Sequence, residues 1–361
     1  MGVTVRKPLI ARIYWPGKKE LAYNDVFIDG EAGSVVTTYE GNHFVETGAF
    51  VRSALVGRGH EWDDQNRFNN AWDARSSHAM ELDGELIGWL TALGLGSVSS
   101  AASGAGYLHT CKPVPIATLT QPPSATIVQK QTDEALYLKY SGICIDEFTI
   151  SGKRGTGADS WLQASWTEIG SGAVVDGSGV STPSTTVTTP IKFSEVSVAT
   201  IGAAGAINVI DRLVDFTFKH GNNLQADKGY LAGSSASASP ASIVDAAPVR
   251  QRLEYGDRRG STTLEITFER TRSASTERTN FRAGTSWAIV LTCPGKLISG
   301  STYETWKLTI PVAKVDTFEP DWDDQSGTSK VLLVPDYDSG TAAPFKIEVT
   351  NARSALLVAA A

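Results

Sequence analysis

Residues 135–151 read ALYLKYSGICIDEFTIS and set the pattern that much of the chain follows. Leu136, Leu138 and Tyr140 share one face of an extended segment, because successive side chains of a β-strand point to opposite sides. Period-two alternation of this kind is typical of a strand with one face buried and the other in water. The segment therefore predicts a half-buried β-strand.

The same alternation recurs through the C-terminal half, at residues 264–268, 306–312 and 345–349, and a further strand is expected at 161–169. Between the apolar runs the chain is rich in Gly, Ala, Ser and Thr, and Met occurs only 2 times. Long helices favour Leu, Glu, Lys and Met more strongly than this. We therefore predict a mainly β protein whose short strands are joined by small-residue loops.

One helix interrupts this pattern near residues 83–94. Asp83 can cap it, and Gly94 or Gly96 can end it. Its apolar residues recur at helical spacing, at Leu86, Ile87, Leu90 and Leu93, with Trp89 beside them. We expect an amphipathic helix that packs against a sheet or a neighbouring subunit.

Three segments are expected to be loops. Residues 57–77 are polar and irregular, with Trp62, Asp63, Asp64 and Trp72 but few aliphatic residues, which predicts a long exposed loop. Residues 170–190 and 232–247 are low-complexity stretches of Ser, Thr, Gly and Ala, which favour flexible surface loops.

The length of 361 residues fits two domains or one large sandwich. Residues 145–151 match 213–219 in their acid, Phe, Thr and apolar positions, and residues 162–166 match 264–268. Short alternating strands also resemble one another by chance, so both duplication and coincidence remain open.

Charge, cysteine content and hydropathy limit the binding partners and the cellular compartment that the sequence suggests. The formal net charge is −7 and no run of Lys or Arg occurs, which disfavours DNA binding through phosphate neutralisation. The same sign would let DNA slide past without adhering. The 3 cysteines are an odd number, which favours a reducing cytoplasm over a disulfide framework. Residues 1–14 lack the apolar core of a secretory signal, and no stretch approaches the ~20 apolar residues that span a bilayer.

Candidate sites for chemistry are weak. His109 and Cys111 would share a strand face as zinc ligands, but a structural zinc site requires four ligands and no second pair stands nearby. His60 and His78 flank acids at positions 63, 64 and 73, a composition that ordinary turns also have. The acids around Trp322, at positions 321, 323 and 324, lack the order of a calcium loop. We therefore expect no catalytic residue, no cofactor and no metal.

The order of features resembles the tail tube proteins of long-tailed, siphovirus-type phages. The resemblance rests on three landmarks between Asp83 and Asn351. They are the 83–94 helix followed by YLHTCKP at 107–113, the strands at 140–152 and 161–170, and the C-terminal series at 303–311, 314–320, 331–337 and 345–351.

This resemblance implies a tail-tube-like β-barrel or sandwich with one or two short packed helices and long loops. Six barrels would form each ring, and stacked rings would enclose a channel for DNA in the virion. If residues 1–190 and 191–361 each supply a barrel, three chains complete a ring; otherwise six do. We favour two tandem barrels.

Implied partners are other copies of the chain and the tail terminator, baseplate or tip, and tape measure proteins. Synthesis would take place in the host cytoplasm, with no membrane attachment. We expect the polar 57–77 loop to stack one ring on the next through Trp62, Asp63, Asp64, Arg67 and Trp72. The alternatives are another virion β-protein (baseplate, tail terminator or decoration), a relative of type VI secretion tubes, or a carbohydrate-binding or carbohydrate-cleaving β-sandwich suggested by the 9 tryptophans.

Overall fold

The structure is a computed structural model. It describes residues 10–14, 18–23, 35–39, 44–52, 67–115, 121–131, 137–155, 157, 160–172, 174–177, 189–229, 249–270, 276–320 and 327–359. The helices are α1 (Gly84–Leu95) and α2 (Thr276–Arg282), with 3₁₀ turns at Phe193–Glu195, Ala203–Gly205 and Ala226–Lys228. The strands are β1 (Ile10–Tyr14), β2 (Lys18–Lys19), β3 (Val35–Tyr39), β4 (Val45–Arg52), β5 (Arg67–Glu81), β6 (Gly96–Ser103), β7 (Gly106–Pro113), β8 (Ala125–Gln131), β9 (Tyr137–Lys153), β10 (Gln163–Ile169), β11 (Val174–Gly177), β12 (Val198–Ile201), β13 (Ile207–Asn208), β14 (Leu213–Gly221), β15 (Thr262–Glu269), β16 (Trp287–Ser299), β17 (Thr302–Pro320), β18 (Thr328–Pro335), β19 (Lys346–Asn351) and β20 (Val358–Ala359).

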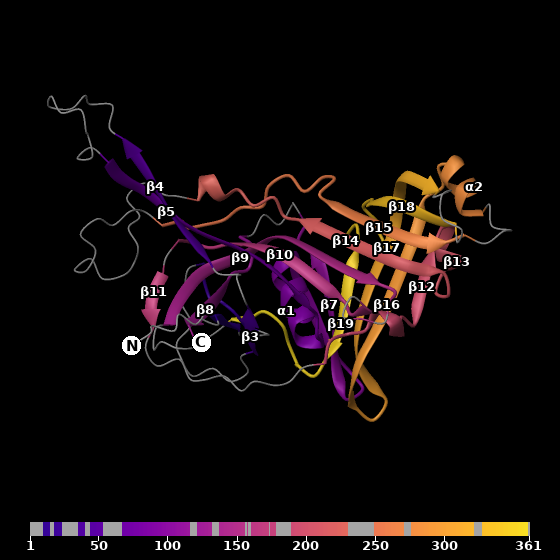
Figure 1. Ribbon diagram of the computed structural model, residues 1–361, viewed down its shortest axis with the longest axis horizontal. Helices are drawn as coiled ribbons and strands as arrows, with labels where there is room; N and C mark the ends of the chain where they lie inside the picture. The colour runs from indigo at the N-terminus through magenta and orange to yellow at the C-terminus, as the bar shows by residue number, and fades with distance from the viewer. Residues whose placement is uncertain are drawn as a thin grey trace, which may run out of the picture.

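The prediction of a mainly β protein is confirmed. All but two of the described strands belong to one 18-stranded network, and every pairing within it is antiparallel. The described strands do not close into a barrel. The long strands β9 and β17 each change neighbours part-way along their length, so they connect the layers around α1 (Figure 1).

The same arrangement of strands occurs twice. In the N-terminal half the neighbouring strands run β4–β5–β10–β9–β8, and in the C-terminal half they run β14–β15–β18–β17–β16. A helix follows the second strand in each half, α1 after β5 and α2 after β15. The N-terminal copy carries an additional hairpin, β6–β7, which lies between α1 and β8 in the chain.

Two irregularities of register show how closely the copies correspond. In β9 the pairing with β10 passes from Glu147 to Ile145 and leaves Asp146 as the extra residue of a bulge. In β17 the pairing with β18 passes from Thr317 to Val315 and leaves Asp316 in the same role.

The other irregularity lies at the opposite side of the same long strands. In the first copy Ala125 pairs with Ile143 and Ile127 pairs with Tyr140. The second copy has the same shift, because Trp287 pairs with Ala313 and Ile289 pairs with Ile310. Both long strands thus hold one more residue than their neighbour over this interval. A fixed offset of position relates β9 to β17 across both bulges.

The sequence matches proposed for a duplication were therefore wrong in their pairing of segments. Residues 145–151 and 213–219 belong to β9 and β14, which are neighbours in the sheet rather than equivalent strands. The equivalent of residues 145–149, IDEFT, is VDTFE at 315–319. Alternating strands share residue types on their buried face, so similarity between short segments cannot distinguish a neighbour from a counterpart.

Helix α1 forms where it was predicted, but its surroundings differ from the expectation. The Asp83 carboxylate accepts hydrogen bonds from the backbone N–H groups of Glu85 (2.9 Å) and Leu86 (2.7 Å), and Gly96 ends the helix at φ 78°. Every helical residue except Glu85 is buried. The helix is therefore enclosed on nearly all sides, by β6, β7, β9, β17 and β19, instead of covering one face of a sheet.

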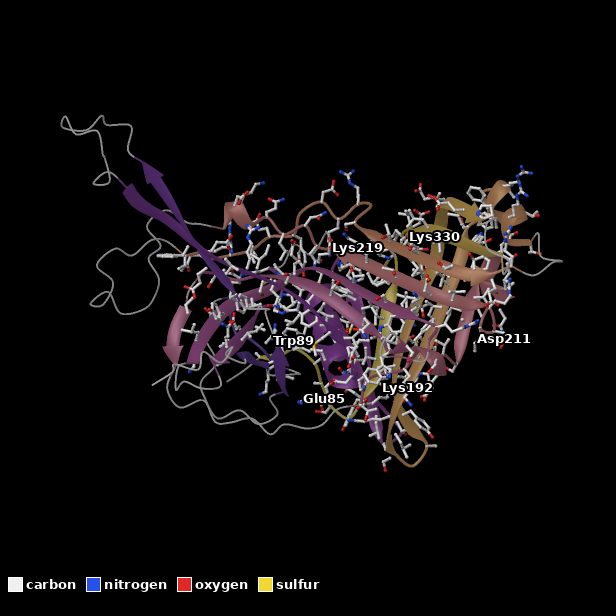
Figure 2. The ribbon with its side chains drawn as sticks, viewed as in Figure 1. Glu85, Trp89, Lys192, Asp211, Lys219 and Lys330 are labelled. Carbon is white, nitrogen blue, oxygen red and sulfur yellow. The ribbon has the colours of Figure 1, made fainter. Side chains whose placement is uncertain are left out.

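The hydrophobic core extends from α1 into both copies. Trp89 is a buried side chain of α1 itself, whereas Lys219 and Lys330 lie on β14 and β18 above the helix in this view (Figure 2). Residues of both halves, including the fully buried Trp166 and Trp306, join one continuous cluster.

Two predicted loops contain strand structure. Residues 67–77 belong to β5, which pairs with β4 and, from Arg75 onward, also with β10. Few aliphatic residues mark this strand because much of it pairs on one side only, and backbone hydrogen bonds do not depend on apolar side chains. Val174–Gly177, inside the predicted 170–190 loop, forms β11. The predicted 232–247 loop lies outside the described residues.

Candidate assembly surface

The joint between the two copies is a continuous antiparallel pairing of β9 with β14. It runs from Glu147 opposite Gly221 to Lys153 opposite Asp215. Beyond it the N–H of Asn222 donates to the carbonyl of Asp146 (2.6 Å). The first strand of the C-terminal copy is thereby added to the long strand of the N-terminal copy.

Side chains close this joint on both faces. Phe148 is fully buried and its ring lies 6.2 Å from Phe218 and 5.6 Å from His220, both on β14. On the other face Lys219 Nζ lies 2.8 Å from a carboxylate oxygen of Glu147. Burial holds the pKa of His220 far below its ordinary value, at about 3, with Arg258 adding to the effect, so the imidazole is neutral at pH 7.

The second copy leaves the equivalent position open. From Lys314 to Pro320, β17 pairs with β18 on one side, and on its other side it pairs with no strand of the described part of the chain. Phe318 and Val315 are only partly buried there, although their counterparts Phe148 and Ile145 are 0% and 1% exposed.

The other open edge belongs to β4. Among the strands in the described ranges, β4 pairs with β5 alone, and Val45 at its start is 56% exposed. Figure 1 shows β4 and β5 at one end of the long axis of the molecule, and β17, β18 and α2 toward the other. The two open strand edges therefore lie at opposite ends of the subunit.

The residues expected to stack rings are only partly placed. Arg67 and Trp72 lie in β5, at positions that pair with Arg52 and Gly48 of β4. Trp62, Asp63 and Asp64 lie outside the described residues. Sequence reasoning missed that β4 and β5 form a two-stranded projection, because the residues of β5 show no apolar alternation.

Of the acid–base cluster considered from sequence, His78 is a buried packing residue, and residues 60, 63 and 64 lie outside the described part of the chain. His78 Nε2 lies 3.2 Å from Glu168 Oε2 and 3.0 Å from Ser76 Oγ, and both the His78 and Glu168 side chains are 0% exposed. Trp166 Nε1 also donates to Glu168 (2.7 Å). The contacts of Ser76 and His78 with Glu168 link β5 to β10, and these buried side chains are closed to a substrate.

The His109–Cys111 pair, which the sequence does not favour as a zinc site, is likewise accounted for by other contacts. His109 contacts Ser100 Oγ (2.8 Å) through Nδ1, and Asn351 Oδ1 and the carbonyl of Arg353 (3.0 Å each) through Nε2. Cys111 is buried against Thr91, and burial raises the pKa of its thiol to about 12. In the described ranges no three His, Cys, Asp or Glu side chains are grouped as a metal site would require. The acids at 321–324 lie outside those ranges.

A surface pocket of about 280 Å³ opens between Arg75, Asp146, Ile169 and residues 224–228. Asp146 accepts a hydrogen bond from the N–H of Leu224 (2.7 Å), and burial raises the pKa of its carboxyl. The lining residues include no His, Cys, Ser or Thr, so the pocket lacks the nucleophile–base pair of a hydrolase. No helix in the described part of the chain is long and apolar enough to cross a membrane.

The antiparallel network and its open strand edges define a mainly β protein whose sheet other strands can extend. A family model for the phage tail tube protein matches residues 77–327, and the chain belongs to this family. No curated protein matches the sequence. The protein is therefore a structural tail tube subunit and a component of the virion, which assembles with itself and with other tail proteins.

Proposed function

We propose that three copies of this chain form one ring and that stacked rings form the hollow tube through which DNA passes. Each chain supplies two equivalent wall segments, the strands from β4 to β10 and those from β14 to β18, within the halves 1–190 and 191–361. The observation that carries this proposal is the repeated strand order with an open edge at each end of the subunit.

The physical reason is that open strand edges bind other strands. An unpaired edge presents N–H and C=O groups that pair readily with another chain. Contacts between different ends of identical subunits close into a ring when the rotation between them divides a full turn. Six wall segments from three chains give that closure with three intermolecular joints and three covalent ones.

The charge of the chain suits a channel for DNA. A formal net charge of −7 disfavours adhesion to phosphates, so DNA would pass through the lumen without specific binding. On the described strands several cations are already paired with acids, for example Lys330 with Glu265 at 2.9 Å. A catalytic function has no support in this arrangement.

The β4–β5 projection is proposed to contact the next ring. Trp62, Asp63, Asp64, Arg67 and Trp72 lie on it or in the segment that connects its strands. Replacing residues 53–66 with a short turn should leave rings that no longer stack. Tubes of unchanged length in electron micrographs would contradict this assignment.

Negative-stain electron microscopy of the purified protein tests the proposal as a whole. We expect rings with three-fold symmetry and six similar wall segments, or tubes built from them. Mass measurement of isolated rings should give three chains. A chain that stays monomeric at high concentration, alone and with the terminator, tip and tape measure proteins, would overturn the proposal.

A further inference from the structure

The register of the internal β9–β14 joint specifies the joint between subunits. We propose that β4 of one copy adds to the open edge of β17 in the next copy, with Thr47 opposite Thr317 and Glu46 opposite Phe318. The inference rests on the proposed ring, because its occupant is a second copy of this chain. It deepens that proposal by naming the two strands and their alignment.

The first step equates β5 with β15. Trp166 on β10 pairs with His78 of β5 and with Phe148 of β9. In the second copy Val331 on β18 pairs with Ile266 of β15 and with Phe318 of β17. Phe148 and Phe318 follow equivalent bulges, so His78 corresponds to Ile266.

The second step equates β4 with β14. Counting along β5 and β15 from His78 and Ile266 makes Ala74 the counterpart of Thr262. Glu46 pairs with Ala74, and His220 pairs with Thr262. Glu46 therefore holds the position of His220, and Thr47 holds that of Gly221.

The third step applies the register of the β9–β14 pairing to β17 and β4. His220 lies opposite Phe148, and Gly221 lies opposite Glu147. Replacing each residue by its counterpart places Glu46 opposite Phe318 and Thr47 opposite Thr317. Both strands have the free edge that this pairing requires within the described part of the chain.

Exposure of side chains agrees with this transfer. Phe318 is partly buried, whereas its counterpart Phe148 packs against Phe218 and His220 of β14 and is fully buried. Val45 takes the position of Lys219, which stays exposed on the outer face of the internal joint. An added strand would cover Phe318, and hydrophobic burial would supplement the backbone hydrogen bonds.

The geometry of the internal joint also selects a site for a disulfide. The bond from the N–H of Asn222 to the carbonyl of Asp146 makes Gly221 and Glu147 a non-hydrogen-bonded pair. Residues of such pairs have Cα atoms about 4.5 Å apart, within the range that a disulfide spans. Thr47 and Thr317 are the corresponding intermolecular pair.

The experiment is cross-linking of the double variant Thr47→Cys/Thr317→Cys under mild oxidation. Assembled protein should yield a reducible ladder of covalent dimers and trimers, with the closed trimer as the largest species. Thr47→Cys and Thr317→Cys alone should give no ladder, and their mixture should give dimers only. The native thiols at positions 111, 144 and 293 are buried and contribute little background.

A register control is the pair Thr47→Cys/Glu319→Cys, which is displaced by two residues and should cross-link far less. Rings or tubes seen by microscopy without a Thr47–Thr317 disulfide would overturn this inference while leaving the proposed function intact. Equal cross-linking of both double variants would overturn the register. Absence of rings and tubes in the unmodified protein would instead overturn the proposed function itself.

Discussion

Phe148 and Phe318 hold the same position in two copies of one strand arrangement, yet only Phe148 is fully buried. Phe148 packs against Phe218 and His220 of an added strand, whereas Phe318 stacks on Phe281 of α2 at 5.6 Å and is partly exposed. The phenylalanine at this position therefore packs inside the subunit in the first copy. In the second copy, under the proposed joint, it contacts a neighbouring subunit.

Alanine at these two positions should have different consequences. Phe148→Ala should lower the free energy of unfolding by about 3–5 kcal/mol, because it opens a cavity in a packed core. Phe318→Ala should lower the free energy of unfolding of the isolated subunit by less than Phe148→Ala does. It should also raise the protein concentration needed for ring formation. Denaturation of unassembled protein and light scattering separate the two effects. Equal losses of subunit stability, with unchanged assembly, would contradict the prediction.

Acid should weaken the β9–β14 joint through His220. The folded pKa is about 3 and the ordinary value is about 6.5, so between these values the unfolded chain binds a proton that the folded chain does not. Stability is therefore retained above pH 6.5 and lost as the pH falls, by up to about 1.4 kcal/mol per pH unit from this group.

The variant His220→Asn tests this pH dependence. Urea denaturation at several pH values between 7 and 4 should show a shallower fall in the variant than in the unmodified protein. Parallel curves would show that His220 does not cause the acid sensitivity.

The cap of α1 should contribute measurably to stability. Asp83→Ala removes the acceptor of two backbone N–H groups and should cost about 1 kcal/mol. Asp83→Ser keeps an oxygen acceptor and should cost less. Thermal unfolding of the three proteins compares them, and an alanine variant as stable as the serine variant would contradict the capping role.

Gly94 should resist substitution because of close contact with β9. A Cβ atom there would lie 2.7 Å from Cε1 of Phe148. Gly94→Ala should therefore destabilise the protein by about 1–3 kcal/mol, in spite of the better helix propensity of alanine. Gly155→Ala is the matched control, since nothing lies within 4 Å of its Cβ position and its φ is not positive. A Gly94 variant as stable as this control would show that the contact relaxes without cost.

The class of the fold and the position of its main helix could be predicted from local patterns of residues. Alternation at residues such as Leu264, Ile266 and Phe268 predicts strands because the pleat sends every second side chain into the core. Asp83 and Gly96 delimit α1 because capping depends on local backbone geometry. These signals act over a few residues, so they can be read without knowledge of the rest of the chain.

Which strands are counterparts and which are neighbours depends on how the whole chain folds. Asp146 and Asp316 are equivalent because each is the extra residue of a bulge, a property that exists only once a partner strand is present. The open edges of β4 and β17 are also invisible in the sequence, since backbone N–H and C=O groups are the same in every strand. Whether those groups are paired depends on contacts between segments far apart in the chain.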